Sequence, residues 1–407
     1  MTVAHPIPTA WLTAGATGAQ NYDEFADDAE ITEIIAANPS SALAIEMPHR
    51  APGSLGKSFA ESLPDAVVRL TQAKDAGAYR RSDDVVVLYR ISGPVPDPSR
   101  ISDADGSTAY GLWCMVDTDQ ISTSAEEPGL VIRNEDVFLE KVRERVALFQ
   151  ALGHLLSPVL LLQTGRGDEL HAALADAAAQ AGSPFATDVD PAGRTHAIWP
   201  LAAGPLADSL RELAGGGELV VADGNHRSLA AQSGGLDRFL AVVTTPASVA
   251  IQPYNRLVHQ LDAPIEELLE RLEKSGAQVA PGTATVPAQG GTVHLYADGR
   301  AFAVTLPRDP HGSVIDNIDH ALVERVLFGD VLGLEPGDKR ITYVGGDYPA
   351  SWLTEEVDAG RSALAVLIAP VTVDDFVEVN LARQKMPRKS TWFTPKARGG
   401  LVVAQVA

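Results

Sequence analysis

Short runs of β-branched and apolar residues alternate with helical patterns along most of this 407-residue chain. That alternation is typical of a mixed α/β (α+β) fold, in which helices flank mixed sheets. The predicted strands are 84–91, 110–117, 158–163, 218–222, 239–244, 292–296, 301–305, 341–344 and 363–368. The predicted helices are 29–37, 138–152, 169–181, 226–231, 265–274 and 317–327.

Polar and Gly/Pro-rich stretches at 50–57, 92–107 and 280–291 predict loops between these elements. The last stretch separates a helical pattern from a new set of strands. We therefore expect a boundary there, between an N-terminal and central region (1–279) and a C-terminal region (280–407). A long surface loop is the alternative interpretation. At roughly 150 residues per domain, the length of the chain suggests two or three domains.

Charge and cysteine content limit the possible partners. The formal net charge is -21, so the chain repels a nucleic-acid backbone, and a small anionic ligand needs a pocket where the local charge is reversed. The single cysteine, Cys114, lies in an apolar run and is expected to be buried and unreactive. Arg50 is the first Arg or Lys of the chain, and the apolar runs are too short for a bilayer. We therefore expect a cytoplasmic protein without a membrane partner.

A tight turn, Asp223-Gly224-Asn225-His226-Arg227, joins a predicted strand to a predicted helix. Asp223 suits a helix cap, and Gly224 permits a ligand to approach the backbone closely. The helix macrodipole disfavours cations in the first turn, yet His226 and Arg227 lie there. Free backbone N–H groups and cationic side chains at one helix start attract an anion, typically phosphate. The alternative is an ordinary turn in which Arg227 pairs with a carboxylate.

The C-terminal segment from Val379 onward is basic and holds no Asp or Glu. Its cations are interleaved with Ser390, Thr391, Trp392 and Phe393. The cations are Arg383, Lys385, Arg388, Lys389, Lys396 and Arg398. One interpretation is a polyphosphate clamp, with lysines as point charges and arginines as forks. The other is a basic face docked on the acidic body of the protein.

Two carboxylates, Glu135 and Asp136, precede the predicted helix 138–152. Capping of the helix explains them, unless they face the phosphate site. In that case Glu135 is a candidate general base, and either residue is a candidate Mg²⁺ ligand. Lys141 and Arg145 lie one turn apart on the same helix.

Further cations are weaker candidates. Lys339 and Arg340 precede the predicted strand 341–344, and Arg256 follows Pro253-Tyr254-Asn255. For each of these residues taken alone, a structural role is favoured over a role in the site. Arg256 could equally lie at the surface, and Lys339 could be solvated.

With these motifs in place, the chain resembles a widespread bacterial and archaeal family catalogued as domain of unknown function 1015. The matches run in family order over nearly the whole chain. They are Asn21-Tyr22-Asp23, Asn38-Pro39-Ser40, Glu135 with Lys141 and Arg145, Ala222 to Arg227, Pro253 to Arg256, Asp338 to Ile341 with Gly345-Gly346, and Met386 to Lys396.

The resemblance extends to the turn itself. Its Asp-Gly-x-His-Arg pattern is similar to the phosphate-binding signature of the ParB and sulfiredoxin-like superfamily, which includes free-serine kinases. This implies a ParB/sulfiredoxin-like phosphate-binding core with additional α+β regions. It also implies a kinase that uses ATP or ADP with Mg²⁺ and phosphorylates a hydroxyl of a small molecule, serine or a serine-like amino acid being the first candidate.

The resemblance and the placement of charge together predict the roles of individual residues. The predicted catalytic residues are Glu135, Asp223 and His226, of which Glu135 and Asp223 are also predicted metal ligands. The predicted phosphate ligands are Gly224, Asn225, Arg227, Lys389, Ser390, Thr391 and Lys396. The predicted supporting residues are Lys141, Arg145, Arg256, Lys339 and Arg340.

Two positions depart from the family pattern. The family usually has His-His in the turn and His before the glutamate, whereas this chain has Asn225 and Asn134. Amides do not take up protons near neutral pH, so these positions cannot shuttle protons. The departures leave two alternatives to a kinase, a non-catalytic nucleotide-binding regulatory protein and a nucleotide or phosphate-ester hydrolase. A DNA-partition role is disfavoured by the charge of -21.

Overall fold

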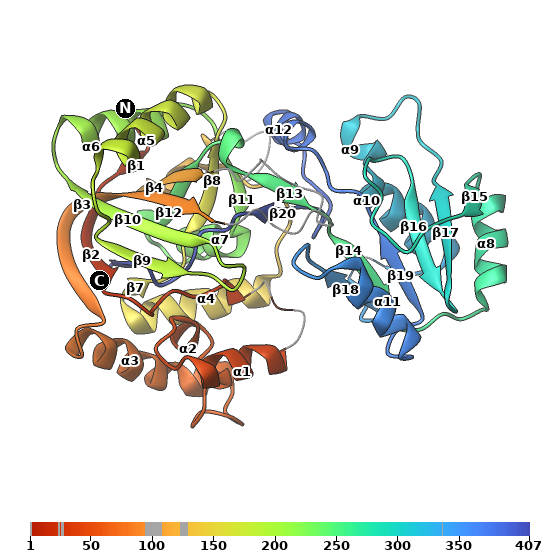
Figure 1. The fold of residues 1–407 in the computed structure, drawn as a ribbon, viewed down its shortest axis with the longest axis horizontal. Helices are drawn as coiled ribbons and strands as arrows, with labels where there is room; N and C mark the ends of the chain where they lie inside the picture. Colours follow the sequence, from red (N-terminus) through yellow and green to blue (C-terminus); the bar gives the residue numbers. More distant parts are fainter. Residues whose placement is uncertain (1, 23–24, 26–27, 94–107, 123–128, 336) are drawn as a thin grey trace. The chain divides into compact units, whose positions relative to one another are not determined.

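The fold is described by a computed structural model for residues 2–22, 25, 28–93, 108–122, 129–335 and 337–407. Two compact units are distinguished (Figure 1). Unit 1 runs up to Val249 and takes up the chain again from Pro395 to Ala407, and unit 2 is Ala250–Thr394. The expected division between 279 and 280 stays a prediction. The mixed α/β fold is confirmed by both units.

The strands of unit 1 form one sheet in the described part of the chain. They are β1 (Ala4–His5), β2 (Ile7–Thr13), β3 (Tyr79–Ser92), β4 (Ala109–Asp117), β5 (Ile121–Ser122), β6 (Val131–Ile132), β7 (His154–Leu155), β8 (Val159–Gln163), β9 (Ala186–Val189), β10 (Thr195–Ala202), β11 (Leu219–Asp223), β12 (Arg238–Thr244) and β21 (Val402–Gln405). The main order is β5-β6-β11-β8-β12-β4-β3-β2-β21-β7, with β10 and β9 branching from β3 and β1 pairing with β4. Parallel pairs (β6 with β11, β8 with β12) lie among antiparallel ones, so the sheet is mixed.

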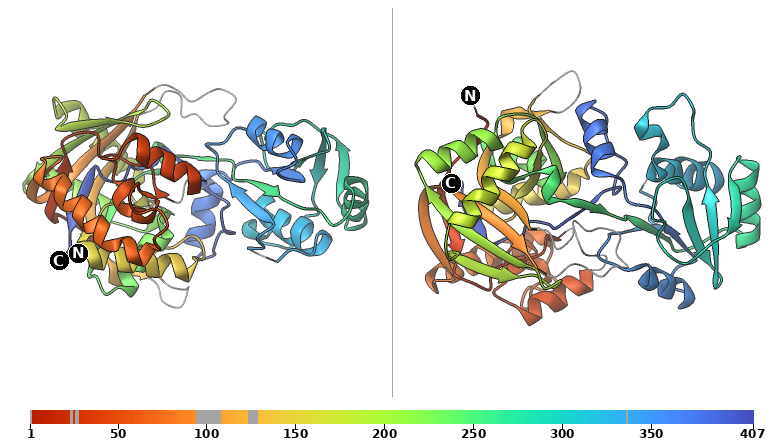
Figure 2. Two further views of the ribbon diagram at one scale, coloured as in Figure 1. Left: turned by 90° about the horizontal axis from the view of Figure 1, so that it is seen from below. Right: turned by 45° about the horizontal axis from the view of Figure 1, so that its top comes forward.

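Helices cover the sheet of unit 1 in two groups. They are α1 (Asp28–Ala37), α2 (Leu43–Glu46), α3 (Phe59–Asp75), α4 (Leu139–Leu152), α5 (Gly167–Gln180), α6 (Pro205–Ala214) and α7 (Asn225–Ser233), with short 3-10 turns at Pro48–Arg50, Thr118–Gln120 and Pro246–Ser248. One apolar core packs α5 and α6 on the central strands, and another packs α1 to α4 beside β2 and β21. In Figure 2 the red-to-orange helices near the N-terminus stay together and apart from the green α5 and α6.

Unit 2 has a sheet of its own. Its elements are β13 (Ala250–Gln252), β14 (Asn255–Val258), α8 (Ile265–Lys274), β15 (Gln278–Pro281), β16 (Val293–Ala297), β17 (Arg300–Thr305), α9 (Val314–Asn317), α10 (Asp319–Leu322), a π-helix (Val323–Val331), β18 (Ile341–Val344), α11 (Ala350–Asp358), β19 (Leu364–Leu367), α12 (Val373–Leu381) and β20 (Trp392–Thr394). The strand order is β15-β17-β16-β19-β14-β18, and β13 pairs separately with β20. α8 and the π-helix pack on one side of this sheet and α11 on the other.

Each predicted strand overlaps an observed one, and the predicted helix 265–274 is found without a shift as α8. Two predictions need correction, and a third falls largely outside the described residues. The predicted helix 317–327 is α9's last residue followed by α10 and a π-helix that continues to Val331. The predicted loop 280–291 begins inside β15, and the loop 92–107 falls largely on residues 94–107, outside the described residues. The predictions omitted the helices α2, α3, α6, α11 and α12. Of these, α3 carries a proline inside the helix and buries few side chains.

Two expectations about individual features can be compared with the structure. Cys114 is fully buried in β4, so its expected burial is confirmed, and burial raises the pKa of its thiol to about 12. Within the described residues, no helix is long and apolar enough to cross a membrane.

His320 gives unit 2 a pH-dependent stability. It is fully buried, and its Nε2 atom lies 3.1 Å from the carbonyl oxygen of Tyr254. Burial and the charge of Arg256 lower the pKa of His320 to about 3, whereas an unfolded histidine titrates near ~6.5. Between those values the unfolded state binds the extra proton. Stability is therefore present above about pH 6.5 and is lost as the pH falls towards about 3.

Urea unfolding of the full chain at about pH 7.5 and about pH 5 tests this dependence. The wild type should lose more stability on acidification than His320→Gln, which keeps an N–H donor but cannot be protonated. Equal losses in the two proteins would contradict the assignment of this pH dependence to His320.

Candidate anion site at the start of α7

The turn between β11 and α7 requires a glycine. Gly224 has φ +97°, a left-handed conformation that side chains rarely adopt. A Cβ atom at this position would lie 2.8 Å from Nε of Arg227, because the Arg227 side chain folds back over the glycine. The turn thus needs glycine at this position for two reasons: its left-handed conformation, and the space that the Arg227 side chain occupies beside it.

Arg227 folds back in order to pair with Asp223. Its Nη2 atom forms an ion pair with Oδ2 of Asp223, and only 8% of the Arg227 side chain is exposed. The interpretation that Arg227 pairs with a carboxylate is confirmed, and the carboxylate is the first residue of the same turn. The anion site at this turn stays a prediction.

Two more side chains reach Asp223 from distant parts of the sequence. Asn21 accepts a hydrogen bond from Nη1 of Arg227 at 2.7 Å and donates one to Oδ2 of Asp223 at 3.3 Å. Lys396 Nζ lies 3.4 Å from Oδ1 of Asp223. Two cations therefore converge on one carboxylate at a helix N-terminus, which gives this small region a positive balance in a protein of net charge -21. Sequence reasoning did not include Asn21 in the site, although its Asn-Tyr-Asp motif had been noticed.

The segment that carries Glu135 is tied to α7 on both sides. Asn225 donates through Nδ2 to Oδ1 of Asn134 at 2.5 Å, and the two side chains are 4% and 1% exposed. The backbone N–H of Phe138 donates to Nε2 of His226 at 3.1 Å. Glu135 is half-buried between these two tie points. The sequence left open whether this segment approaches the turn, and the structure brings them together.

These contacts also describe the chemical state of His226. Its Nε2 atom accepts a hydrogen bond, so the ring is neutral with its proton on Nδ1. The ring stacks on Phe138 with 6.2 Å between the ring centres. His226 thus anchors the start of α4, and its predicted catalytic role stays a prediction.

Arg145 and Lys141 differ in environment, although both lie on α4. Arg145 is buried, donates to the carbonyl oxygen of Glu46 at 3.2 Å and lies 4.1 Å from the ring centre of Tyr22. Tyr22 follows Asn21, so Arg145 supports the segment that reaches Asp223. Lys141 is exposed.

The other predicted site residues belong to unit 2. Arg256 is fully buried, which excludes the alternative of a surface position. Arg340 pairs with Asp338 and Asp262, and Lys339 is exposed. The remaining predicted phosphate ligands in this unit are Lys389, Ser390 and Thr391, of which Ser390 is fully buried.

The carboxylate of Asp223 is already contacted by cations of the protein itself, which disfavours a resident metal ion there. Both carboxylate oxygens of Asp223 already accept from cations, Oδ2 from Arg227 and Oδ1 from Lys396. In the described part of the chain, no group of three or more His, Cys, Asp or Glu side chains is arranged to hold a metal. Metal binding by Glu135 and Asp223 therefore stays a prediction. It requires that Mg²⁺ enters the site bound to the phosphates of a nucleotide.

The family described as "Protein of unknown function (DUF1015)" matches residues 9–325, which include the turn, Asn21 and Glu135. The chain belongs to this family. A comparison with curated proteins found no match.

Three solved structures show a weak likeness to this one. A free serine kinase in complex with AMP has a TM-score of 0.38 and 14% identity, over 69% of this chain and 87% of that one. A conserved hypothetical protein from Pyrococcus furiosus has a TM-score of 0.37 and 12% identity, over 69% of this chain and 90% of that one. SbnI with a C-terminal truncation, from Staphylococcus aureus, has a TM-score of 0.39 and 11% identity, over 70% of this chain and 84% of that one. Likenesses of this size do not bear on the activity of this chain.

Proposed function

We propose that the start of α7 holds the phosphate groups of a nucleotide and that the protein transfers a phosphoryl group to the hydroxyl of a small molecule. Serine or a serine-like amino acid is the first candidate acceptor. The observation that supports this most is the convergence of Arg227 and Lys396 on Asp223 at a helix N-terminus. Phosphoryl transfer depends mainly on positioning and on neutralisation of charge, which such a cluster supplies.

In this proposal the backbone N–H groups at Gly224 and Asn225 face the phosphates, as at other helix N-termini that bind anions. Arg227 offers a planar fork and Lys396 a point charge. Asp223 holds the two cations in place before the ligand arrives, so little reorganisation is needed on binding.

Glu135 is the proposed general base. Its neighbour Asn134 bonds to the first residue of α7, so a carboxylate beside Asn134 is well placed to reach an acceptor hydroxyl near the phosphates. His226 is held in the neutral state and is proposed to position rather than to transfer protons. Lys389, Ser390 and Thr391 stay predicted phosphate ligands.

A non-catalytic nucleotide sensor is the second candidate. The buried Asn134–Asn225 pair favours it, since one hydrogen bond joins the two amides and neither takes up a proton. A sensor would bind nucleotide without needing Glu135. A hydrolase, the third candidate, would release phosphate without an added acceptor.

Incubation with Mg-ATP and a pool of amino acids that includes serine separates these candidates. We expect ADP and a phosphorylated acceptor, detected by mass spectrometry, and a loss of at least about 100-fold in rate in Glu135→Gln. Glu140→Gln, which neutralises an exposed carboxylate of α4, is the control and should retain most of the rate. ADP with free phosphate in the absence of an acceptor would indicate a hydrolase. Binding of ATP without turnover would indicate the sensor.

A further inference from the structure

Two chain segments bring side chains to Asp223, and they are joined to each other. Residues 18–21, here the Asn21 arm, carry Asn21, and residues 396–399, the Lys396 arm, carry Lys396. The arms are antiparallel, and Ala19 and Gly399 exchange two backbone hydrogen bonds of 3.0 Å. A contact that holds this junction in place therefore holds two of the three partners of Asp223, Asn21 and Lys396, at the same time.

The side chain of Arg398 closes the junction. It extends from the Lys396 arm and forms an ion pair with Asp188 of β9, with 2.5 Å between Nε and Oδ2, and 11% of the Arg398 side chain is exposed. Gly18 of the other arm packs directly against this pair. A Cβ atom at Gly18 would lie 2.0 Å from Oδ2 of Asp188 and 2.9 Å from Nε of Arg398.

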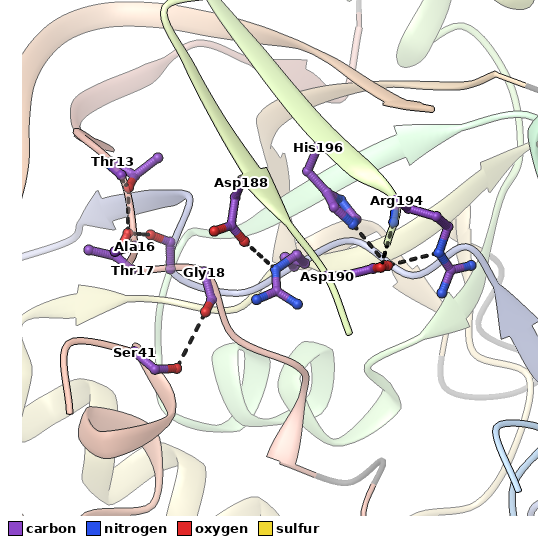
Figure 3. Close-up of polar contacts among 12 residues, drawn as sticks. Thr13, Ala16, Thr17, Gly18, Ser41, Asp188, Asp190, Arg194 and His196 are labelled. Carbon is purple, nitrogen blue, oxygen red and sulfur yellow. Dashed lines mark hydrogen bonds and ion pairs between the residues drawn. The ribbon is translucent and has the colours of Figure 1, made fainter. Parts of the chain in front are cut away.

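A buried chain of hydrogen bonds holds the backbone of Arg398. Its backbone N–H donates to the Tyr89 hydroxyl at 3.3 Å, and that hydroxyl lies 2.5 Å from Nδ1 of His196. His196 Nε2 lies 3.2 Å from Oδ2 of Asp190, which Arg194 also contacts at 2.8 Å (Figure 3). Burial lowers the pKa of His196, which keeps the ring neutral. The pattern is then complete, since His196 donates to Asp190 and accepts from Tyr89, whose oxygen accepts from Arg398.

The Asn21 arm has its own supports at the same place. Thr17 donates to the carbonyl oxygen of Gly400 at 2.8 Å and lies 2.6 Å from the hydroxyl of Thr13. Ser41 donates to the carbonyl oxygen of Gly18 at 3.4 Å, as Figure 3 shows. These bonds hold the backbone of each arm, whereas the Arg398–Asp188 pair is the side-chain contact against which both arms rest.

We propose that Arg398 is a positioning residue, which through its ion pair with Asp188 locks the two arms so that Asn21 and Lys396 reach Asp223 together. The proposal rests on the proposed function only in that the positioned groups serve a phosphate. It assigns Arg398 a role different from that of a phosphate ligand in a basic clamp, because its guanidinium is turned to a carboxylate of β9.

Hydrogen exchange without any ligand gives the first test. In Arg398→Ala, amides of residues 15–22 and 396–400 should exchange about tenfold faster, as expected for the loss of one charged contact at the junction. Arg398→Lys keeps a cation for Asp188 and should restore most of the protection. Arg238→Ala removes a partly exposed ion pair with Asp117 elsewhere in unit 1 and is the control. Unchanged exchange of both arms in Arg398→Ala overturns the proposal.

A mutant cycle for ATP affinity gives the second test. Arg398→Ala should weaken binding about tenfold in the wild-type background and have little further effect in Asn21→Ala/Lys396→Ala, because it acts through those two residues. Equal effects in both backgrounds would mean that Arg398 contacts the ligand itself, which overturns the proposal. If the wild type binds no ATP, the proposed function fails, and hydrogen exchange alone decides the role of Arg398.

Discussion

Arg227→Ala is expected to weaken ATP binding by about 10- to 100-fold, the effect of losing a charged hydrogen-bond partner of a phosphate. The substitution has a second consequence. Arg227 neutralises Asp223 in the wild type, and without it the Asp223 carboxylate stays beside the phosphate position with Lys396 as its cationic partner. Repulsion between carboxylate and phosphate then adds to the lost attraction.

Titration of ATP into the variants measures this loss. Arg227→Lys retains the charge but not the fork, and it should fall between the wild type and Arg227→Ala. Arg211→Ala, which removes a surface pair with Asp208 in the same unit, should bind as the wild type does. If Arg227→Ala binds ATP as tightly as the wild type, the phosphates are bound elsewhere.

Arg256→Ala is expected to destabilise unit 2 by about 3–5 kcal/mol, the range for breaking a buried ion pair from one side. Arg256 is 0% exposed in β14, pairs with Glu324 at 3.3 Å and lies 4.4 Å from the ring centre of Tyr343. Its guanidinium also donates to the carbonyl oxygens of Tyr254 at 2.9 Å and Arg388 at 3.4 Å. Alanine would leave these acceptors without their donor and open a cavity.

Hydrogen exchange of β14 and β19 in the full chain reports on this loss without requiring the two units to unfold together. In Arg256→Ala, the amides of β14 and β19 should lose protection from hydrogen exchange. Arg271→Ala, which removes an exposed pair with Glu267 on α8, should leave them unchanged. Protection equal to that of the wild type would show that Arg256 is not needed for the stability of unit 2.

The elements that sequence predicted well are those with a strong local pattern. β11 and β12 each contain an uninterrupted apolar run (219–222 and 239–243), and α8 has an apolar stripe with an acidic first turn and a basic last turn. α3 has a local start signal, the capping box between Ser58 and Glu61, but Pro64 interrupts the helix and only three of its side chains are buried, so its apolar pattern is weak. Its existence follows from packing against other helices, which a local pattern does not contain.

The candidate site was predictable only in part, for a similar reason. The turn is contiguous in sequence, and its glycine and two cations mark it as unusual. Its partners Asn21 and Lys396 are separated from Asp223 by 202 and 173 residues, and only the folded sheet brings them together. Nor did the sequence show that Asn134 and Asn225, the two departures from the family pattern, bond to each other.

That pairing changes how the two departures are understood. Taken singly, each asparagine stands where the family pattern has a histidine. Taken together, they form one buried contact between a donor and an acceptor, which ties the Glu135 segment to α7 without a titrating group. The Asn134–Asn225 contact thus connects the two parts of the candidate site in this chain.

Equilibrium titration of ATP into the wild-type protein, with pyrophosphate as competitor, tests the central claim most directly. We expect saturable binding with a Kd between about 1 μM and 1 mM, displaced by pyrophosphate and weakened by salt. Such behaviour would place the phosphates, rather than the base, at the main point of recognition. Absence of binding at millimolar ATP, or binding that pyrophosphate does not displace, would contradict a phosphate site at the start of α7.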